Sequence, residues 1–459
     1  MTTLIQNSSN KKYLYIIMLI ALPISIQGLV FQLQSLTEKA FLGNIDTKYL
    51  SAIGATQFPL GATIDSIIAL CTGITILVSQ MYGAKKTDGI VSTVKSSIAF
   101  NTIISGLFFI LWFVFPRYIF NLLGVDAAIM DYCMTYAQIC SIGFLFLGID
   151  SALQSTLLGM GDTRPILYAG TIKVFLNIAI SWVLIFGKFG LPPMYIKGAA
   201  IGTVIANVTS SIFIIIYCLI IRRKEFGLGG RFYSFDLSSY KKTFMLGLPT
   251  AIEFFAWNFS NLVLLGFLNG ISYIATTIYT LTFGIEIIVF QIFNGYSKAA
   301  LTLIGNKIGE NDPPGAKRAF NLCMRLTIIT VIISCIILIL FPKAIIDVFS
   351  NEDDVILKTV PFLIFTAFII APKCINVLVG SGIRAYGDTK WMLYTQIFGS
   401  LFVITCSFIL VKIASLGVTA VYITIFLDEC TRAAINYHHY LKGDKSQAFS
   451  KPIIEQVEF

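Results

Sequence analysis

The sequence predicts an all-α polytopic membrane protein with twelve transmembrane helices in two six-helix bundles, related by pseudo-two-fold symmetry along the membrane normal. Three observations lead to this prediction: the apolar composition, the number of long apolar runs, and a set of short motifs repeated at one offset. Of 459 residues, 56% are hydrophobic and only 12% are charged, with a mean hydropathy of +0.82. Soluble domains carry about 25% charged residues, so this chain has too few for a water-facing surface.

The apolar runs give the number of spans, because a helix that crosses a bilayer needs about 20 mainly apolar residues. Such runs fall near 13–37, 54–82, 93–115, 133–159, 166–188, 199–221, 243–268, 273–304, 318–341, 356–379, 390–414 and 416–440. The first run follows Lys11 and Lys12, but it is longer than the apolar region of a signal peptide and lacks an early cleavage site. We therefore expect a retained first helix and an even number of spans, which places both termini on one side.

The distribution of basic residues indicates which side that is. The terminal segments and every second loop hold 22 of the 33 lysines and arginines, whereas the alternate loops hold seven. By the positive-inside rule the basic side is cytoplasmic. We expect both termini to be cytoplasmic and the protein to lie in a prokaryotic plasma or inner membrane.

An internal repeat relates the two halves of the chain. Three motif pairs share an offset of 226 residues: Ala21–Pro23 with Gly247–Pro249, Ser79–Gly83 with Gly305–Gly309, and Gly161–Arg164 with Gly387–Lys390. Six helices per half give the halves the same orientation, so an axis along the membrane normal relates them, and a solute path between the two lobes follows.

The repeat and the longest basic loop together define the expected domains. These are a cytoplasmic N-terminal tail at 1–12, an N-lobe of helices one to six at 13–221, a cytoplasmic linker at 222–242, a C-lobe of helices seven to twelve at 243–441, and a cytoplasmic C-terminal tail at 442–459.

Composition also excludes several classes of function. The nine cysteines form no CxxC pair, and the two histidines, His438 and His439, lie together near the C-terminus, so no metal site or histidine-based catalytic site is expected. A phosphate-binding GxxxxGK[ST] loop is absent. We expect no enzyme activity and no cofactor. The net charge of +9 is scattered over short loops, which indicates topology and not a nucleic-acid partner.

Several segments resemble those of the multidrug and toxic compound extrusion (MATE) family. They are the Leu-Pro pairs at 22–23 and 248–249, Thr37–Gly43, Gln80–Gly83, Asn177 with Ile185–Pro192, and Gly382–Thr389. The resemblance covers essentially the whole chain. It implies secondary active efflux, in which cationic organic compounds leave the cell while protons or sodium ions enter. It also implies that Glu38 and Asn177 contribute to an N-lobe cation site.

The chain departs from the family pattern at three positions. Trp257 and Lys373 stand where many members carry acids in helices seven and ten, and Ser181 stands where one branch carries an aspartate. These departures speak against the family's usual C-lobe sodium site and favour proton coupling.

Ionisable groups inside the expected spans are the candidate site residues, because each costs several kcal/mol unless it is paired or hydrated. The acids are Glu38, Asp65, Glu253 and Glu286, and Gln27 is the repeat partner of Glu253. Each has a structural alternative: an interfacial carboxylate for Glu38, and a helix-to-helix hydrogen bond for Asp65.

Lys373 requires a carboxylate partner if it lies inside the membrane. We expect its ammonium to replace a bound metal cation by pairing with Glu253 or Glu286; the alternative is a lysine near a helix end that reaches the headgroups. Trp257 is a candidate for cation–π contact with flat organic cations.

Three further side chains have a structural interpretation. Asp162 and Asp388 precede apolar runs and are expected to cap helices, and Asp428 is expected to pair with Arg432 at i,i+4.

The leading function is therefore efflux of small organic cations by a monomer that contacts membrane lipid. A flippase for lipid-linked sugars is the alternative within the same superfamily, since it favours a cationic cavity and Lys173 and Lys373 are both intramembrane. A membrane-embedded transferase is a third class, for which the acidic run at 351–354 is the candidate site.

Overall fold

The chain folds into α-helices throughout the part described by the structure, a computed structural model that describes residues 10–43, 45–223, 225–227, 233–349, 352–414, 416–445 and 452–453. These residues contain no strand, so the all-helical prediction is confirmed. The expected terminal tails and the linker lie only partly within the described residues.

The helices of the first half of the chain are α1 (Asn10–Gly43), α2 (Thr47–Leu70), α3 (Thr72–Gly83), α4 (Thr87–Val114), α5 (Pro116–Leu122), α6 (Ala127–Ser141), α7 (Phe144–Gly159), α8 (Arg164–Phe186) and α9 (Tyr195–Ile220). Those of the second half are α10 (Leu237–Asn269), α11 (Tyr273–Gly309), α12 (Pro313–Leu340), α13 (Pro342–Asp347), α14 (Asp353–Ala385), α15 (Thr389–Phe408), the π-helical turn η2 (Ile409–Ile413) and α16 (Gly417–Lys445).

Ten helices of the described chain are long and apolar enough to cross a membrane, or eleven if the bent pair α6 and α7 is one span. That pair bends by 50°. The chain is therefore an integral membrane protein. The long α16 is not among these spans, and it carries Asp428, Glu429 and Arg432 in its middle.

The chain divides into two compact units whose boundaries fall inside α1 and α10. The N-terminal unit runs from Ile26 to Ala251, and the C-terminal unit joins the chain up to Ser25 with the chain from Ile252 onward. The boundaries lie two residues after Pro23 and Pro249, the prolines of the first repeated motif. The first part of each of these two helices thus belongs to the unit formed mainly by the other half of the chain.

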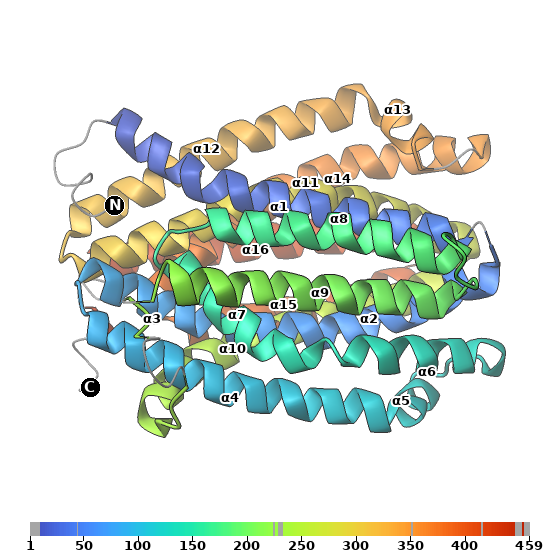
Figure 1. Cartoon of the computed structure of the whole chain (residues 1–459). Helices are drawn as coiled ribbons and strands as arrows, with labels where there is room; N and C mark the ends of the chain where they lie inside the picture. The colour runs from blue at the N-terminus through green and yellow to red at the C-terminus, as the bar shows by residue number, and fades with distance from the viewer. Residues whose placement is uncertain are drawn as a thin grey trace. The chain divides into compact units, whose positions relative to one another are not determined.

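Each unit has its own apolar core. In the N-terminal unit, α8 packs against α9 and α4 against α7, and in the C-terminal unit α14 packs against α11 and α16 (Figure 1). The core of the N-terminal unit includes Trp112, Phe120 and Tyr136, and that of the C-terminal unit includes Leu264, Tyr279 and Tyr422.

Hydrogen bonds join the first parts of α1 and α10 to the units to which those parts belong. The Ser25 hydroxyl donates to the carbonyl of Ile292 at 2.9 Å within the C-terminal unit. The Tyr240 hydroxyl donates to Asn101 at 2.8 Å within the N-terminal unit. Just ahead of α10, hydrogen bonds from Ser239 and Ser92 hold the pKa of the Asp236 carboxyl below its ordinary value.

The capping prediction is correct for Asp388 and wrong for Asp162. Asp388 accepts a hydrogen bond from the backbone N–H of Trp391 at 3.2 Å, which caps α15. Asp162 instead accepts hydrogen bonds from Tyr217 and Arg222 at the end of α9, and Thr163 makes no side-chain cap to α8. A guanidinium within reach is a stronger donor than a backbone N–H, so Asp162 turns toward it.

Backbones approach closely where α10 crosses the break between α2 and α3 in the N-terminal unit. A Cβ on Gly247 would overlap the carbonyl oxygen of Leu70, and one on Gly73 would overlap that of Thr243. Small residues at helix crossings permit this approach in membrane proteins.

We expect Gly247→Val to destabilise the protein by about 1–3 kcal/mol, the usual cost of overpacking. Thermal denaturation of purified protein in detergent measures it. Gly284→Val is the matched control, because a Cβ on Gly284 meets no atom within 4 Å. Equal melting temperatures for the two variants would contradict the account of this crossing.

Candidate functional site

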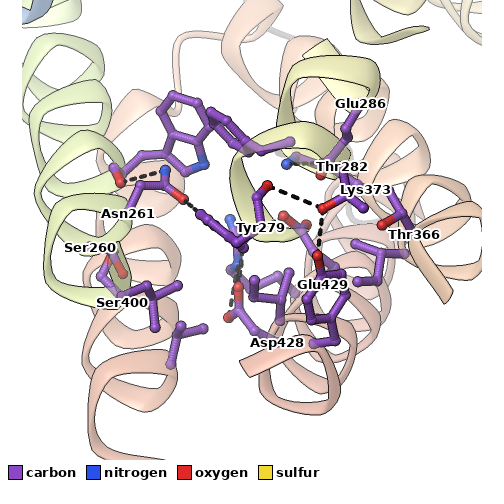
Figure 2. A pocket seen from close by; sticks show the side chains of 18 of the residues that line it. Ser260, Asn261, Tyr279, Thr282, Glu286, Thr366, Lys373, Ser400, Asp428 and Glu429 are labelled. Carbon is purple, nitrogen blue, oxygen red and sulfur yellow. Dashed lines mark hydrogen bonds and ion pairs between the residues drawn. The ribbon is translucent and has the colours of Figure 1, made fainter. Parts of the chain in front are cut away.

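A polar cavity lies inside the C-terminal unit, between α10, α11, α14, α15 and α16 (Figure 2). Trp257, Tyr279, Phe283 and Tyr422 form its aromatic wall. Its charged lining residues are Glu286, Lys373, Asp428, Glu429 and Arg432. Because these side chains come from helices far apart in sequence, the cavity exists only once the helices have packed.

The ion pair between Lys373 and Glu286 joins α14 to α11 in this cavity. The Lys373 Nζ lies 2.5 Å from a Glu286 carboxylate oxygen, and the two side chains are 13% and 11% exposed. Lys373 therefore does not reach outward to headgroups, and Glu286 is one of the two partners that the sequence suggested. The same ammonium lies 5.7 Å from the centre of the Trp257 ring.

Glu253, the other suggested partner of Lys373, pairs with Arg384 instead. An Arg384 Nη2 lies 2.5 Å from Glu253 Oε1, with both side chains 11% exposed. Glu253 Oε2 and Arg384 Nε have no further hydrogen-bond partner in the described part of the chain. The sequence analysis used Arg384 only as a family marker and did not assign it a partner.

A third ion network lies on α16. The expected Asp428–Arg432 pair is confirmed at 2.7 Å, and Arg432 also lies 2.9 Å from Glu429, which the sequence analysis did not single out. Its third contact is with Gln396 of α15, which accepts a hydrogen bond at 2.7 Å. The three α16 side chains are all more than nine-tenths buried.

A chain of neutral side chains leads away from Glu429. Asn376 donates to Glu429 at 3.2 Å and accepts from Asn436 at 2.8 Å. Asn436 in turn accepts from the indole N–H of Trp391 at 2.9 Å. On α16, Glu429, Arg432 and Asn436 recur at spacings of three and four residues, so they form one inward-facing stripe.

The N-terminal unit brings together the two residues that the resemblance implicated. Glu38 of α1 is 3% exposed and accepts a hydrogen bond from Thr203 of α9 at 3.0 Å. Asn177 of α8 is fully buried and donates to Thr203 at 3.0 Å. Thr203 thus links Glu38 to Asn177, although its sequence context is that of an ordinary small residue in a span.

Asp150 of α7 and Lys173 of α8 also carry charge inside this unit. Gln154 donates to Asp150 at 2.7 Å, and the Lys173 Nζ lies 5.2 Å from the centre of the Phe31 ring. In the described part of the chain, no carboxylate lies within 4.0 Å of Lys173. The sequence analysis missed Asp150, although it interrupts an apolar run as Asp65 does.

The remaining candidates lie outside these clusters. Asp65 is exposed on α2, and Gln27 is half-buried beside Gly170. Gln27 and its repeat partner Glu253 fall in different compact units, and the candidate role of Gln27 stays a prediction. In the acidic run at 351–354, Asn351 lies outside the described residues, and Asp354 forms an exposed ion pair with Lys358 at 2.7 Å.

A known family model matches both halves of the chain. The MatE family model matches residues 23–183 and again 249–409, which together cover more than half of the chain. The two matches are offset by 226 residues, the offset of the three motif pairs.

Named relatives are similar over most of their length. The chain is 25% identical over 427 residues to a "Probable multidrug resistance protein NorM" of Thermotoga maritima, covering 92% of this chain and 91% of that protein. It is 24% identical over 417 residues to the "Uncharacterized transporter YisQ" of Bacillus subtilis, covering 87% and 90%.

Solved structures share the fold. One, described as "Crystal structure of MATE in complex with MaD3S", has a TM-score of 0.87 at 18% identity and covers 97% of this chain and 98% of that one. Another, an "Outward-facing conformation of a multidrug resistance MATE family transporter of the MOP superfamily", has a TM-score of 0.89 at 18% identity and covers 98% of each chain.

We expect Lys373→Met to destabilise the protein by about 3–5 kcal/mol, because it leaves the Glu286 carboxylate buried without a partner. The double variant Lys373→Met/Glu286→Met should regain most of that loss, which thermal denaturation in detergent measures. Lys358→Met on the same helix is the control: its ion pair is exposed, so its effect should stay below about 1 kcal/mol. Equal losses in the single and double variants would contradict a stabilising pair.

Proposed function

Because the chain belongs to the MatE family of transporters, we propose that it exports organic cations, including drugs, across the membrane in exchange for protons. Sodium is the alternative coupling ion. The names of its relatives as multidrug resistance proteins support this substrate class. The cavity of the C-terminal unit supports it too, since an aromatic wall beside carboxylates suits a flat or amphipathic cation.

The burial of Glu38 is the observation on which proton coupling depends most. Glu38 is 3% exposed, and its carboxylate accepts a hydrogen bond from the neutral hydroxyl of Thr203. No basic side chain of the described residues lies within 4.0 Å of it. A buried negative charge without a basic partner is costly, and a bound proton removes that charge. Glu38 therefore suits a group that takes up a proton on one side and releases it on the other.

Lys373 supports protons over sodium in the C-terminal unit. Its ammonium lies 2.5 Å from Glu286 and so already supplies the positive charge that a bound metal ion would bring. A sodium ion at Glu286 would have to displace a covalently attached cation. We infer that Lys373 serves as a permanent cation beside Glu286, and that the exchanged proton binds at a group other than Glu286.

The topology that this function requires has twelve spans and cytoplasmic termini. We propose α16 as the twelfth span: its charges fail a test of apolarity, yet they pair with one another and are more than nine-tenths buried. The two halves, related by an axis along the membrane normal, would then alternate in exposing a path between them, as in transporters with parallel repeats.

A flippase for an anionic, lipid-linked cargo is the second candidate function. The half-buried Lys173, with no carboxylate of the described chain within 4.0 Å, is the observation that favours it, because a free ammonium binds phosphate. Glu38 and Asp150 in the same unit oppose it.

We expect purified protein in proteoliposomes to move ethidium when a proton gradient is imposed alone. Movement with a sodium gradient alone would keep the antiporter but overturn the interpretation of Lys373. Absence of movement with either gradient would favour the flippase.

Two variants test the assigned residues in the same assay. Glu38→Gln should markedly slow proton-driven movement, because the amide cannot carry a proton at that site, and Lys373→Ala should abolish coupled transport by leaving Glu286 unpaired. Asp354→Asn, a change in an exposed pair, is the control and should retain the wild-type rate. Wild-type coupling in Lys373→Ala would contradict the role given to that lysine.

A further inference from the structure

The two adjacent carboxylates of α16 share one guanidinium inside the cavity of the C-terminal unit. Asp428 and Glu429 are 5% and 4% exposed, and Arg432, which is 7% exposed, contacts both. The other two buried acids of this unit each have a base of their own: Glu286 has Lys373, and Glu253 has Arg384. The α16 network is therefore the place where acids outnumber bases.

The contacts of Arg432 are divided unequally between the two carboxylates. Its Nε donates to Asp428 at 2.9 Å, and its Nη1 donates to Gln396 at 2.7 Å. Its Nη2 lies 2.7 Å from Asp428 and 2.9 Å from Glu429. The other oxygen of Glu429 accepts from Asn376, a neutral amide. Asp428 thus contacts two nitrogens of the guanidinium, Nε and Nη2, whereas Glu429 contacts only Nη2, which it shares with Asp428.

In the described part of the chain, no base other than Arg432 forms an ion pair with Asp428 or Glu429. The charged groups that face it are Lys373 from α14, already 2.5 Å from Glu286 of α11, and Glu253 from α10, itself paired with Arg384. The α15 side chains are the neutral Gln396 and Ser400, and Tyr422 of α16 is neutral as well. Together with the Lys373–Glu286 and Arg384–Glu253 pairs, the α16 network contains four acids and three bases. With every one of these groups ionised, they carry one uncompensated negative charge.

An uncompensated charge costs several kcal/mol in a low-dielectric interior, and two carboxylates that share a site relieve that cost when one of them binds a proton. We propose that Asp428 and Glu429 share one exchangeable proton and form a second proton site of this transporter, in the C-terminal unit. This inference rests on the proposed proton-coupled function and deepens it, because it assigns a proton site that is separate from Glu38.

The site links proton movement to cargo in a direct way. Loss of the proton to water leaves the cavity with one negative charge, and one organic monocation against the aromatic wall of Trp257, Tyr279, Phe283 and Tyr422 restores neutrality. Uptake of a proton removes that charge and releases the cation. Proton and cargo therefore exclude each other through charge balance, and no covalent bond other than the O–H bond is made or broken.

The test is a pH titration of the protonated carboxyl C=O band by infrared difference spectroscopy on the full-length protein in lipid, made in a Glu38→Gln background. That background removes the Glu38 signal, and a further Asp150→Asn change identifies any band of the other buried acid of the N-terminal unit. Apart from such a band, we expect one carboxyl band to remain and to titrate. Adding Glu429→Gln or Asp428→Asn should remove it, whereas adding Asp354→Asn should not. A band that persists in both variants, or a background with no titrating band, would overturn the proposal.

Isotope labelling keeps the test valid if a variant does not fold. In the Glu38→Gln protein, carboxyl-¹³C glutamate or aspartate should shift the titrating band; a band that neither label shifts would overturn the proposal. Tetraphenylphosphonium added to weakly buffered Glu38→Gln protein should release about one proton per bound cation, and binding without release would count against it.

The spectroscopic test and the transport assay fail independently. The infrared band needs no transport, so its absence overturns the α16 site even where ethidium moves with the proton gradient. Conversely, a titrating band in a protein that moves no cation with either gradient leaves the α16 site standing and overturns the proposed efflux function.

Discussion

Charge compensation inside a low-dielectric helix bundle is the constraint on which the rest of this structure depends. The backbone is satisfied by helices alone, as a membrane requires, so the remaining electrostatic cost falls on side chains. Ion pairs meet this cost in the C-terminal unit. Lys373 with Glu286 joins α14 to α11, and Arg384 with Glu253 joins α14 to α10. Arg432 pairs with Asp428 and Glu429 within α16. The Lys373–Glu286 pair and the α16 network also line the cavity, whereas the Arg384–Glu253 pair lies outside it.

The two repeats share motifs at a constant offset, but their ionisable residues stand at different positions. At the offset of 226 residues, Asp150 corresponds to Asn376, Leu147 to Lys373 and Leu60 to Glu286. The buried acids of the C-terminal unit thus lie on α10, α11 and α16, whereas those of the N-terminal unit lie on α1 and α7. Duplicated helices keep their packing because apolar contacts are tolerant of substitution, whereas ionic groups are free to move between helices as long as each finds a partner.

Helix α16, which we propose as the twelfth span, shows how paired charges lower the hydropathy of a buried helix. It fails the test of apolarity because of three charged residues in its middle, yet each of them is more than nine-tenths buried and paired within one turn or across to α15. A hydropathy scale counts every charge as exposed to lipid, and pairing removes most of that cost. The charged side chains that lower the hydropathy of α16, Asp428, Glu429 and Arg432, are the ones that line the cavity.

The sequence by itself determined the helical class, the approximate place of each helix, the repeat and the family, because these follow from local apolar runs and from motifs at a constant offset. It also singled out Glu38, Lys373 and Glu286, since an ionisable residue in an apolar run is conspicuous without any structure. Only the tertiary structure decided the partners: that Glu286 and not Glu253 faces Lys373, that Thr203 joins Glu38 to Asn177, and that Glu429 shares Arg432 with Asp428. The tertiary structure also places the boundaries of the two compact units inside α1 and α10. Partner choice depends on helix rotation and on contacts between residues as far as 165 positions apart in the chain, which a linear pattern of apolar and polar residues does not encode.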